Sequence, residues 1–422
     1  MRVGIVGAGI TGLALTHYLR ERDVDVLTLE ARSEAGGVIQ SKRVGGRTVE
    51  VGPQRMRATP GIRELAATAG VEDDVVTADD GPIYVYADGK LREGPTSVPA
   101  LVRTTLLSWP AKFRLLAEPL TRPGMPQETV AEVFTRKFGT EAYERFIGPL
   151  YGGLYGSDPA EMPAGFALEG LLQRETETGS MLAAFRRRLG GGEKPPAVSL
   201  EGGLQRLPVG LAERYSSSVR LGEPATSIRR VDDGFVLETP AGSYTVNEVV
   251  VTAPAEVAGN LLPPLADGAE GLRELTYNPL ALVYLESEHS PVREGFGYQV
   301  SFQEDLHTLG VSFNGVLFDR GNLCTAFLGG MHEPGIVDDD DGRLGTVAAR
   351  EFERATGCGA SVLGVERRDR WFPAYDHTWW GLEKLALPDR VHLATNYTAR
   401  MGIPSRVREA RTLAEGLADD AT

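Results

Sequence analysis

The chain begins MRVGIVGAGITGLALTHYLRERDVDVLTLEA (residues 1–31), and this stretch decides the fold. Val3 to Val6 has the pattern of a short buried strand, and three glycines in a G-x-G-x-x-G spacing follow it at once. Apolar residues then recur at helical spacing, and a second apolar run over 24–29 ends on Glu30. Strand, glycine-rich turn, helix, strand and acid occur in the order of a dinucleotide-binding βαβ unit.

Each glycine of this turn has a separate task in such a unit. Gly7 permits the tight turn, Gly9 lets the backbone approach a pyrophosphate, and Gly12 lets the helix pack on the strand. The pyrophosphate then lies at the positive end of the helix, beside Ile10 and Thr11.

The residues after this unit distinguish between dinucleotides. Glu30, with Ala31 beside it, is expected to accept hydrogen bonds from the ribose hydroxyls, and an acid here disfavours the 2′-phosphate of NADP. The pair Gly36-Gly37 allows a second close backbone approach along the same cofactor, as an extended FAD requires. A plain nicotinamide dehydrogenase has no need of that pair. The alternative is a surface turn without a ligand.

The composition limits the class of protein. A chain of 422 residues exceeds what one hydrophobic core usually organises, so two or three domains are expected. The net charge of −14 argues against a nucleic-acid partner. Cys324 and Cys358 lack metal-ligand spacing and are interpreted as reduced core thiols, so we expect no metal site and a cytoplasmic location. No apolar run approaches the ~20 residues of a spanning helix, and the N-terminus enters a strand without a signal peptide.

Four stretches carry a family resemblance. Residues 30–41 fit the pattern E-x5-GG-x-I-x-S, with Val38 in place of a bulky or basic residue, and VGPQRMR (51–57) is similar to LGP-x-x-x-R. The other two are FIGPLYGGLYGSDP (146–159) and SLEGGLQ (199–205). Together they resemble the FAD-dependent amine oxidase superfamily and, within it, the protoporphyrinogen oxidases, along nearly the whole chain. The stretch 146–159 is the most specific, because other amine oxidases lack it.

The resemblance implies cofactor contacts far from the first turn. In that family the segment equivalent to 51–57 passes the flavin ring, and a backbone group in a later strand-rich region contacts the adenine. Near the C-terminus a strand over 391–395 precedes a helix that Ser405 is expected to cap and that runs to Leu417, although Thr395 stands where the family has glycine. The helix N-terminus there points at the pyrophosphate or the flavin carbonyl. The implied contacts are Gly52, Pro53, Ala225, Asn396, Gly402 and Ile403.

The expected fold class is α/β, with a Rossmann-like FAD-binding domain interleaved with a strand-rich α+β substrate domain and a helical insertion. Helical spacing fills the region between Pro95 and Pro195, whereas short alternating strands with turns begin at Val219. The expected boundaries are 1–60, 201–256 and 381–422 for the FAD-binding domain, 61–90 and 257–380 for the substrate domain, and 91–200 for the helical domain.

The resemblance implies the oxidation of a porphyrinogen in haem biosynthesis, with protoporphyrinogen IX and coproporphyrinogen III both open as substrates. Non-covalent FAD would remove six electrons in three turnovers, with molecular oxygen as the expected acceptor. The six histidines show no ligand spacing, and no catalytic acid–base pair is identified. Arg57 is the first candidate to bind a substrate propionate, because a guanidinium binds a carboxylate through two parallel hydrogen bonds, and Arg55 is the second.

Three other functions stay open. A flavin amine oxidase usually keeps a lysine near the flavin, but no lysine occurs between Lys194 and Lys384. Carotenoid desaturation is a further redox alternative. A protein that binds FAD without catalysis is the alternative of another class, and bleaching of the flavin by substrate would separate it from the enzymes.

Residues 97–122 are a candidate membrane contact. Trp109 and Phe113 lie among aliphatic residues there, together with Glu118 and four basic residues, Arg103, Lys112, Arg114 and Arg122. A basic amphipathic surface with an aromatic anchor can lie in the headgroup plane. The alternative is a pair of helices whose apolar face packs on its own domain. The sequence leaves the oligomeric state open.

Overall fold

Five parallel strands from distant parts of the chain form one sheet. The computed structural model describes the whole chain except residues 79–80, 96, 185–194, 290–292, 399–400 and 420–422. The strand order in the sheet is β10-β2-β1-β14-β20, and every neighbouring pair is parallel. The strands are β1 (Arg2–Val6), β2 (Asp25–Leu29), β10 (Val219–Arg220), β14 (Glu248–Val251) and β20 (Val391–Leu393). Their carboxyl ends therefore meet at one edge.

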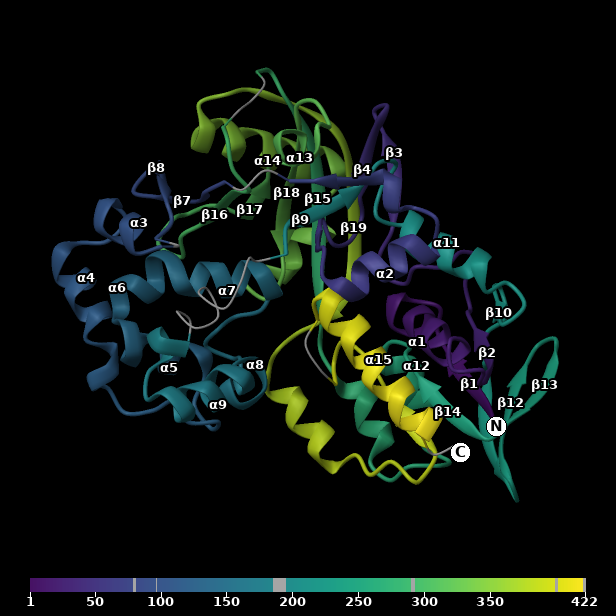
Figure 1. Cartoon of the computed structure of the whole chain (residues 1–422). Coiled ribbons are helices and arrows are strands. Elements are labelled where there is room, and N and C mark those ends of the chain that lie inside the picture. Colours follow the sequence, from purple (N-terminus) through teal and green to yellow (C-terminus); the bar gives the residue numbers. More distant parts are fainter. Residues whose placement is uncertain (79–80, 96, 185–194, 290–292, 399–400, 420–422) are drawn as a thin grey trace.

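Both faces of this sheet are covered, which explains its nearly continuous apolar strands. On one face α1 (Ile10–Arg20) packs along α15 (Ile403–Asp419), although the two helices come from opposite ends of the chain (Figure 1). Val3 and Ile5 share a core with residues of both helices. The same core includes α2 (Pro60–Thr68) and α11 (Arg206–Arg214).

The opposite face is covered by a small antiparallel sheet and a short helix. The sheet consists of β11 (Ser227–Val231), β12 (Gly234–Thr239) and β13 (Gly242–Val246), and the helix is α12 (Ala255–Leu261). Phe235 and Leu237 of the small sheet pack in a second core with Val249 and Val251 of β14. The strand-rich meander predicted from Val219 onward is present.

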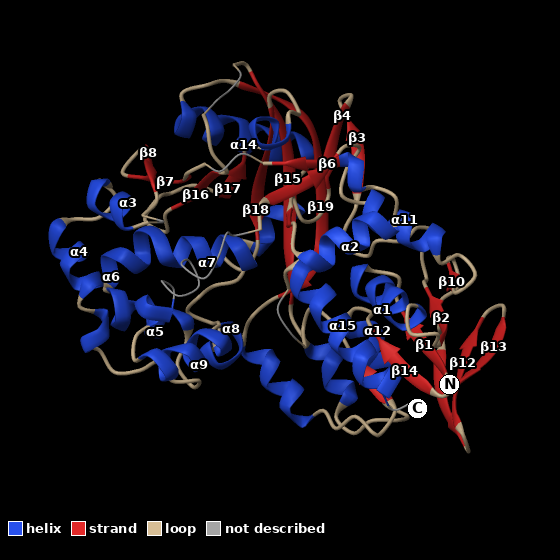
Figure 2. Ribbon diagram, viewed as in Figure 1, coloured by secondary structure: helices blue, strands red, loops and turns tan. Residues whose placement is uncertain are grey.

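A second, seven-stranded sheet lies beside the parallel one (Figure 2). Its order is β19-β15-β18-β17-β16-β7-β8, with all neighbours antiparallel except β16 and β7. The strands are β7 (Ile83–Ala87), β8 (Lys90–Glu93), β15 (Tyr277–Ser287), β16 (Gly297–Val300), β17 (Thr308–Ser312), β18 (Leu323–Gly329) and β19 (Ala360–Pro373). Helix α14 (Asp341–Thr356) covers one face through Leu344 and Phe352. On the other face Leu282 and Tyr284 pack with Val49, which lies close to the expected flavin segment.

Small sheets connect these two parts. Strands β3 (Ser41–Val44) and β4 (Arg47–Glu50) form a hairpin. Strand β9 (Ala197–Leu200) pairs with both β5 (Met56–Arg57) and β6 (Val75–Thr77). Short helix α13 (Asn314–Phe318) follows β17.

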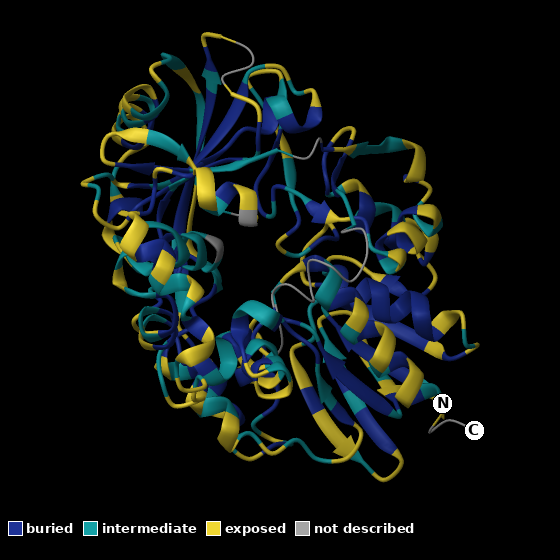
Figure 3. Cartoon of the chain, turned by 60° about the vertical axis from the view of Figure 1, so that its left-hand side comes forward, coloured by how far each residue is buried: buried dark blue, intermediate teal, exposed yellow. Residues whose placement is uncertain are grey.

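Residues 98–178 form a group of helices to one side, at the left in Figures 1 and 2. They are α3 (Val98–Arg103), α4 (Trp109–Leu116), α5 (Val130–Phe138), α6 (Thr140–Ala142), α7 (Gly148–Tyr155), α8 (Ala164–Ala167) and α9 (Glu169–Thr178). Thr129 and Glu132 form a capping box at the start of α5. Figure 3 shows buried residues along both large sheets and alternating buried and exposed residues on these helices. No helix in the described part of the chain is long and apolar enough to cross a membrane.

Three local predictions are wrong. Ser405 does not cap the last helix, because α15 begins at Ile403 and Ser405 lies inside its first turn. Strand β20 ends at Leu393, two residues before the predicted end. Cys324 is a buried thiol as expected, whereas Cys358 is only partly buried and is therefore not a core thiol.

Candidate functional site

The first glycine-rich turn has the geometry of a backbone cradle. Gly7 has a φ of +111°, and a Cβ on Gly12 would lie 2.0 Å from the carbonyl oxygen of Gly7. Gly9 is different, because the atom nearest to a Cβ built there is the Cα of Gly37, at 3.8 Å. Glycine at 7 and 12 is therefore required by the chain itself, whereas the space at Gly9 is free for a ligand.

The second glycine pair packs directly on the first turn. The N–H of Gly36 donates to the carbonyl of Ala8 at 2.9 Å, and Gly9 and Gly36 form an isolated β-bridge. Gly36 and Gly37 both have positive φ, at +129° and +61°. The pair is therefore a second wall of the same cradle and not a separate surface turn.

Glu30 lies at the carboxyl end of β2 and faces the first turn. The residue is 8% exposed, and its two carboxylate oxygens accept hydrogen bonds from the N–H of Ala8 at 2.7 Å and of Arg32 at 3.0 Å. The N–H of Glu223 donates to the carbonyl of Glu30 at 2.8 Å, which brings the segment containing Ala225 to this end of the cradle. Ala31 is exposed beside it. Each carboxylate oxygen keeps a lone pair for a hydroxyl.

Gly52 and Pro53 continue the cradle beyond the glycine pair. The N–H of Val51 donates to the carbonyl of Gln40 at 2.8 Å. A Cβ on Gly52 would lie 1.9 Å from the carbonyl oxygen of Val38. The 51–53 backbone thus passes against the residues that follow Gly37, with no space for a larger side chain at position 52.

The C-terminal stretch reaches the same edge of the sheet. The N–H of Ala394 donates to the carbonyl of Val251 at 3.0 Å, so β20 ends beside β14, the neighbour of β1. Asn396 is half-buried, and Ile403 begins α15. Gly402 is exposed, and no atom lies within 4 Å of a Cβ built there. Two helix N-termini, from α1 and α15, therefore lie at one edge with open backbone beside each.

These residues fit a dinucleotide. Two open glycines, two helix N-termini and a buried carboxylate supply space, backbone donors and a ribose acceptor. The set comes from the predicted residues of 7–12, 30–37 and 52–53 and from those around 396–403. Among the described residues no group of three His, Cys, Asp or Glu side chains could hold a metal ion.

The two candidate anchors differ in their surroundings. Arg57 is exposed and donates to the carbonyl of Pro195 at 3.1 Å. Arg55 lies 4.8 Å from the centre of the Phe296 ring, and no carboxylate or hydrogen-bond acceptor contacts it in the described part of the chain. Burial, together with the positive charge of Arg57, lowers the pKa of Arg55 to about 10. A cation with a neighbouring cation and no counter-charge favours an anionic ligand.

Arg406 also lies in this region, and no sequence pattern singles it out. It lies in the first turn of α15, is 4% exposed, and donates to the carbonyl of Thr395 and to Glu409. Burial lowers its pKa. The contact ties the helix N-terminus to the end of β20, and only the packing of α15 reveals it.

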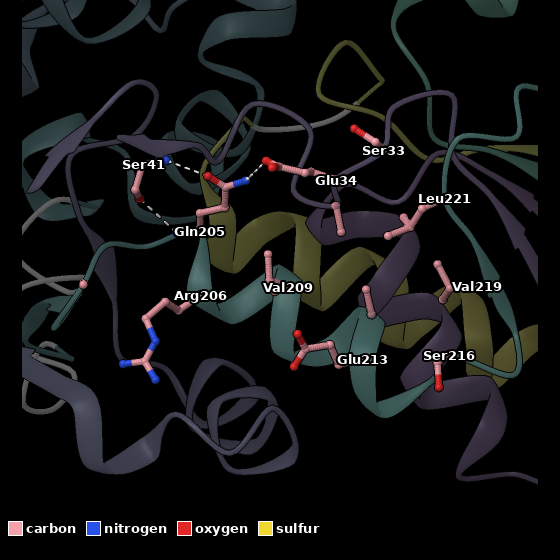
Figure 4. Close-up of a pocket in the computed structure, with 13 residues that line it drawn as sticks. Ser33, Glu34, Ser41, Gln205, Arg206, Val209, Glu213, Ser216, Val219 and Leu221 are labelled. Atoms are coloured by element: carbon pink, nitrogen blue, oxygen red, sulfur yellow. Dashed lines mark hydrogen bonds between the residues drawn. The ribbon is translucent and has the colours of Figure 1, made fainter. Parts of the chain in front are cut away.

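A pocket of about 580 Å³ lies outside the cradle (Figure 4). Its wall includes Ser33, Glu34, Gln205, Val209 and Glu213, from the turn after β2 and from α11. Gln205 donates to Glu34 at 3.1 Å across it. None of the glycines at positions 7, 9, 12, 36 and 37 lines this pocket, so it is separate from the predicted cofactor contacts.

Comparison with known proteins agrees with this geometry. The sequence profile of the flavin-containing amine oxidoreductases matches residues 10–417. A chloroplastic protoporphyrinogen oxidase of Oryza sativa is 28% identical over 99% of this chain and 88% of its own length. A coproporphyrinogen III oxidase of Bacillus subtilis is 24% identical over 83% and 82%. Both relatives cover most of the chain, so the likeness is not confined to the nucleotide-binding turn.

Solved structures confirm the fold. A candidate protoporphyrinogen oxidase from Exiguobacterium superposes with a TM-score of 0.80 at 24% identity, over 99% of both chains. A cyclohexylamine oxidase from Brevibacterium oxydans gives 0.73 at 16% identity, over 100% of this chain and 99% of the other. The predicted α/β fold class is therefore confirmed. The chain belongs to the flavin-containing amine oxidoreductase family and is a flavin-dependent oxidoreductase.

Proposed function

We propose that this protein oxidises a porphyrinogen to the porphyrin in haem biosynthesis. The observation that carries the proposal is the likeness to a protoporphyrinogen oxidase along 99% of the chain. The amine oxidases share the fold at lower sequence identity. The absence of lysine between Lys194 and Lys384 also disfavours an amine oxidase. Protoporphyrinogen IX and coproporphyrinogen III are both candidate substrates, because relatives named for each resemble the chain.

The flavin in this proposal is FAD, held without a covalent bond. The two glycine turns and Glu30 lie at one edge of the sheet with the Gly52 and Asn396 segments, a span that suits an extended dinucleotide. Bound FAD supplies the removal of two electrons at a time, so a porphyrinogen needs three turnovers. Molecular oxygen is the proposed acceptor of those electrons.

The chain itself would bind and orient the substrate. Arg55 is the stronger candidate for a propionate, because it is half-buried and has no acid partner among the described residues. Arg57, the first candidate from the sequence, is exposed and bonded to a backbone carbonyl, so it is the weaker one. The backbone N–H groups at the start of α15 would stabilise negative charge on the reduced ring.

The deciding experiment mixes the purified yellow protein anaerobically with each porphyrinogen. We expect the flavin absorbance near 450 nm to bleach and porphyrin fluorescence to appear. When air is admitted, we expect the yellow colour to return and hydrogen peroxide to form. Benzylamine and a carotenoid serve as controls for the alternative reactions. The proposal is overturned if neither porphyrinogen bleaches the flavin. If benzylamine and the carotenoid also fail to bleach it, the result supports the non-catalytic alternative.

We also propose that the helical region touches a membrane surface. Six large apolar side chains of this region are exposed, between 45% and 89%: Val102, Trp109, Phe113, Leu116, Leu120 and Met125. We call this set the 102–125 face. Trp109, Phe113 and Leu116 of α4 are therefore exposed, whereas Ala111 and Leu115 of the same helix pack in the second core. A hydrophobic porphyrinogen would benefit from delivery at a lipid surface.

Three of the four basic residues of 97–122 have partners within the protein, whereas Arg103 is exposed. Lys112 is 6% exposed and donates to the carbonyls of Val102 and Thr104. Arg114 donates to backbone carbonyls at the end of α5, and Arg122 pairs with Glu128. Because these three cations have partners within the protein, attraction to lipid in this proposal depends chiefly on apolar insertion, with Arg103 as the remaining cation of the stretch. A cytoplasmic location stays a prediction.

A further inference from the structure

A buried hydrogen-bond network joins the expected flavin segment to the seven-stranded sheet. Asn314, at the start of α13, donates to the side-chain oxygen of Gln54 at 2.7 Å across 260 residues of sequence. It also donates to the hydroxyl of Thr325 at 2.8 Å and accepts a hydrogen bond from Ser312 at 2.7 Å. Asn314 and Thr325 are fully buried, and Gln54 is 9% exposed.

The N–H groups and the carbonyl oxygens of both side-chain amides are hydrogen-bonded. The Asn314 amide gives both N–H bonds and accepts one bond. The Gln54 amide accepts from Asn314 and donates to the carbonyls of Glu50 at 3.1 Å and Gly52 at 2.9 Å. Gln54 thus closes its own backbone turn on one side and binds the sheet on the other. Such a satisfied buried network fixes a single arrangement.

The turn that Gln54 closes is the one that passes the cofactor cradle. Gly52 lies against the carbonyl of Val38, directly after the second glycine pair. Tyr284 of β15 donates to the carbonyl of Glu50 at 3.1 Å, so the sheet holds this turn at two points. Arg55 follows Gln54 immediately and lies on the ring of Phe296, just before β16.

We propose that Asn314 is a positioning residue for the flavin site. It acts through Gln54, whose place fixes the backbone of Gly52 and Pro53 against the flavin and sets the direction of Arg55. The seven-stranded sheet and the cradle meet at this amide pair, so a shift of one is transmitted to the other. The inference rests on the proposed binding of FAD and deepens it by naming the contact that aligns the substrate side with the cofactor side.

The test compares Asn314→Leu, Gln54→Met and the double variant with the wild type. Each single variant is expected to retain FAD, to shift or sharpen the flavin absorbance bands, and to lower kcat/KM for the porphyrinogen at least tenfold. The double variant is expected to be no worse than the worse single one, because both substitutions break the same bond. Asn314→Ser, which keeps a short donor, is expected to recover part of the spectrum.

Asn322→Leu is the matched control. Asn322 is also an amide of this sheet and donates to the carbonyl of Ser287 at 2.9 Å, but it makes no contact with the turn at Gln54. It is expected to lower the unfolding temperature without moving the flavin bands. Equal spectra and kinetics for the Asn314 and Asn322 variants overturn the proposal. Fully additive effects of Asn314→Leu and Gln54→Met in the double variant overturn it as well. If Asn314→Leu does not fold, Gln54→Met tests the same bond from its other partner.

The flavin spectrum separates this proposal from the proposed function. A wild-type protein that oxidises no porphyrinogen removes the kinetic readout alone, and the spectral comparison still decides whether Asn314 positions the turn. Normal turnover with an unchanged spectrum in the Asn314 variants overturns the positioning role and leaves the porphyrinogen oxidase proposal intact.

Discussion

Arg55 lies 4.8 Å above the ring of Phe296 and has Arg57 as its charged neighbour. Arg55 belongs to the predicted flavin segment, and Phe296 directly precedes β16 of the seven-stranded sheet. Their contact places an uncompensated guanidinium where the cofactor part and the sheet meet. Ligand binding would supply the missing negative charge.

Replacing Arg55 by Gln is expected to raise KM for a porphyrinogen while FAD content stays constant. A lost charge-assisted hydrogen bond is worth roughly 1.5–3 kcal/mol, or about a 10- to 150-fold change in KM. Arg57→Gln is the matched control, with a smaller expected change because that side chain is exposed. Steady-state kinetics with fluorescence detection of the porphyrin measure both. A larger effect at Arg57 would return the anchor to that residue.

Gly9→Val is expected to give a folded but colourless protein. The nearest atom to a Cβ at Gly9 is 3.8 Å away, so the added side chain meets the pyrophosphate and not the protein. Gly271→Val is the control, since no atom lies within 4 Å of a Cβ there and the position is outside the cradle. Absorbance at 450 nm and the far-UV circular dichroism spectrum are the measurements. A yellow Gly9→Val protein would place the cofactor elsewhere.

Lys137→Met is expected to lower the free energy of unfolding by about 3–5 kcal/mol. Lys137 is 1% exposed and pairs with Glu118 and Glu175, which are also buried, so its removal leaves two carboxylates without a counter-charge. Urea unfolding measures the change. A variant that also carries Glu118→Gln and Glu175→Gln should regain part of the loss. No loss in the single variant would show that the triad is not a stabilising contact.

The same triad predicts loss of stability in acid. Burial alone would raise the pKa of Glu118, but hydrogen bonds from Ser180, Lys137 and two backbone N–H groups outweigh it and lower the pKa. The folded pKa is therefore below the unfolded one, so this contribution is complete above the unfolded pKa and disappears as the pH falls through the folded value. Unfolding of wild type and Glu118→Gln at pH 7 and near pH 3 measures the difference. The difference in the free energy of unfolding between wild type and Glu118→Gln should be smaller near pH 3 than at pH 7.

The 102–125 face is expected to bind neutral vesicles at both low and high salt. Flotation with phosphatidylcholine vesicles tests this for wild type and for Trp109→Ser/Phe113→Ser/Leu120→Ser, which should remain unbound. Leu221→Ser/Val257→Ser/Val362→Ser is the control, because those apolar side chains are exposed elsewhere. Binding that requires anionic lipid and low salt would support headgroup attraction instead. Absence of wild-type binding would remove the membrane proposal.

The first turn and its βαβ context could be read from the sequence because the constraint is local. Gly7 needs a positive φ and Gly12 needs contact with Gly7, and both demands act within six residues. Burial of a parallel sheet on both faces likewise leaves a continuous apolar pattern in 3–6 and 24–29. Such signals do not depend on where the rest of the chain goes.

The distant contacts were decided by the tertiary structure. Lys112 has a side chain that can bind a lipid headgroup. In the fold, however, its ammonium group is buried and donates to two backbone carbonyls at the end of α3. Ser405 has the side chain of a helix cap, yet packing against α1 lets α15 begin at Ile403. A local pattern gives each side chain's chemistry, but it cannot show which partner reaches it.

Asn314 and Gln54 illustrate the limit most clearly. Neither belongs to a recognisable motif with the other, and 260 residues separate them in the sequence. The spacing of glycines predicted a nucleotide-binding turn, because backbone sterics act between neighbours. Only the folding of the seven-stranded sheet against the segment 51–57 decided which amide contacts Gln54, because a buried hydrogen bond is specified by position in space and not by distance along the chain.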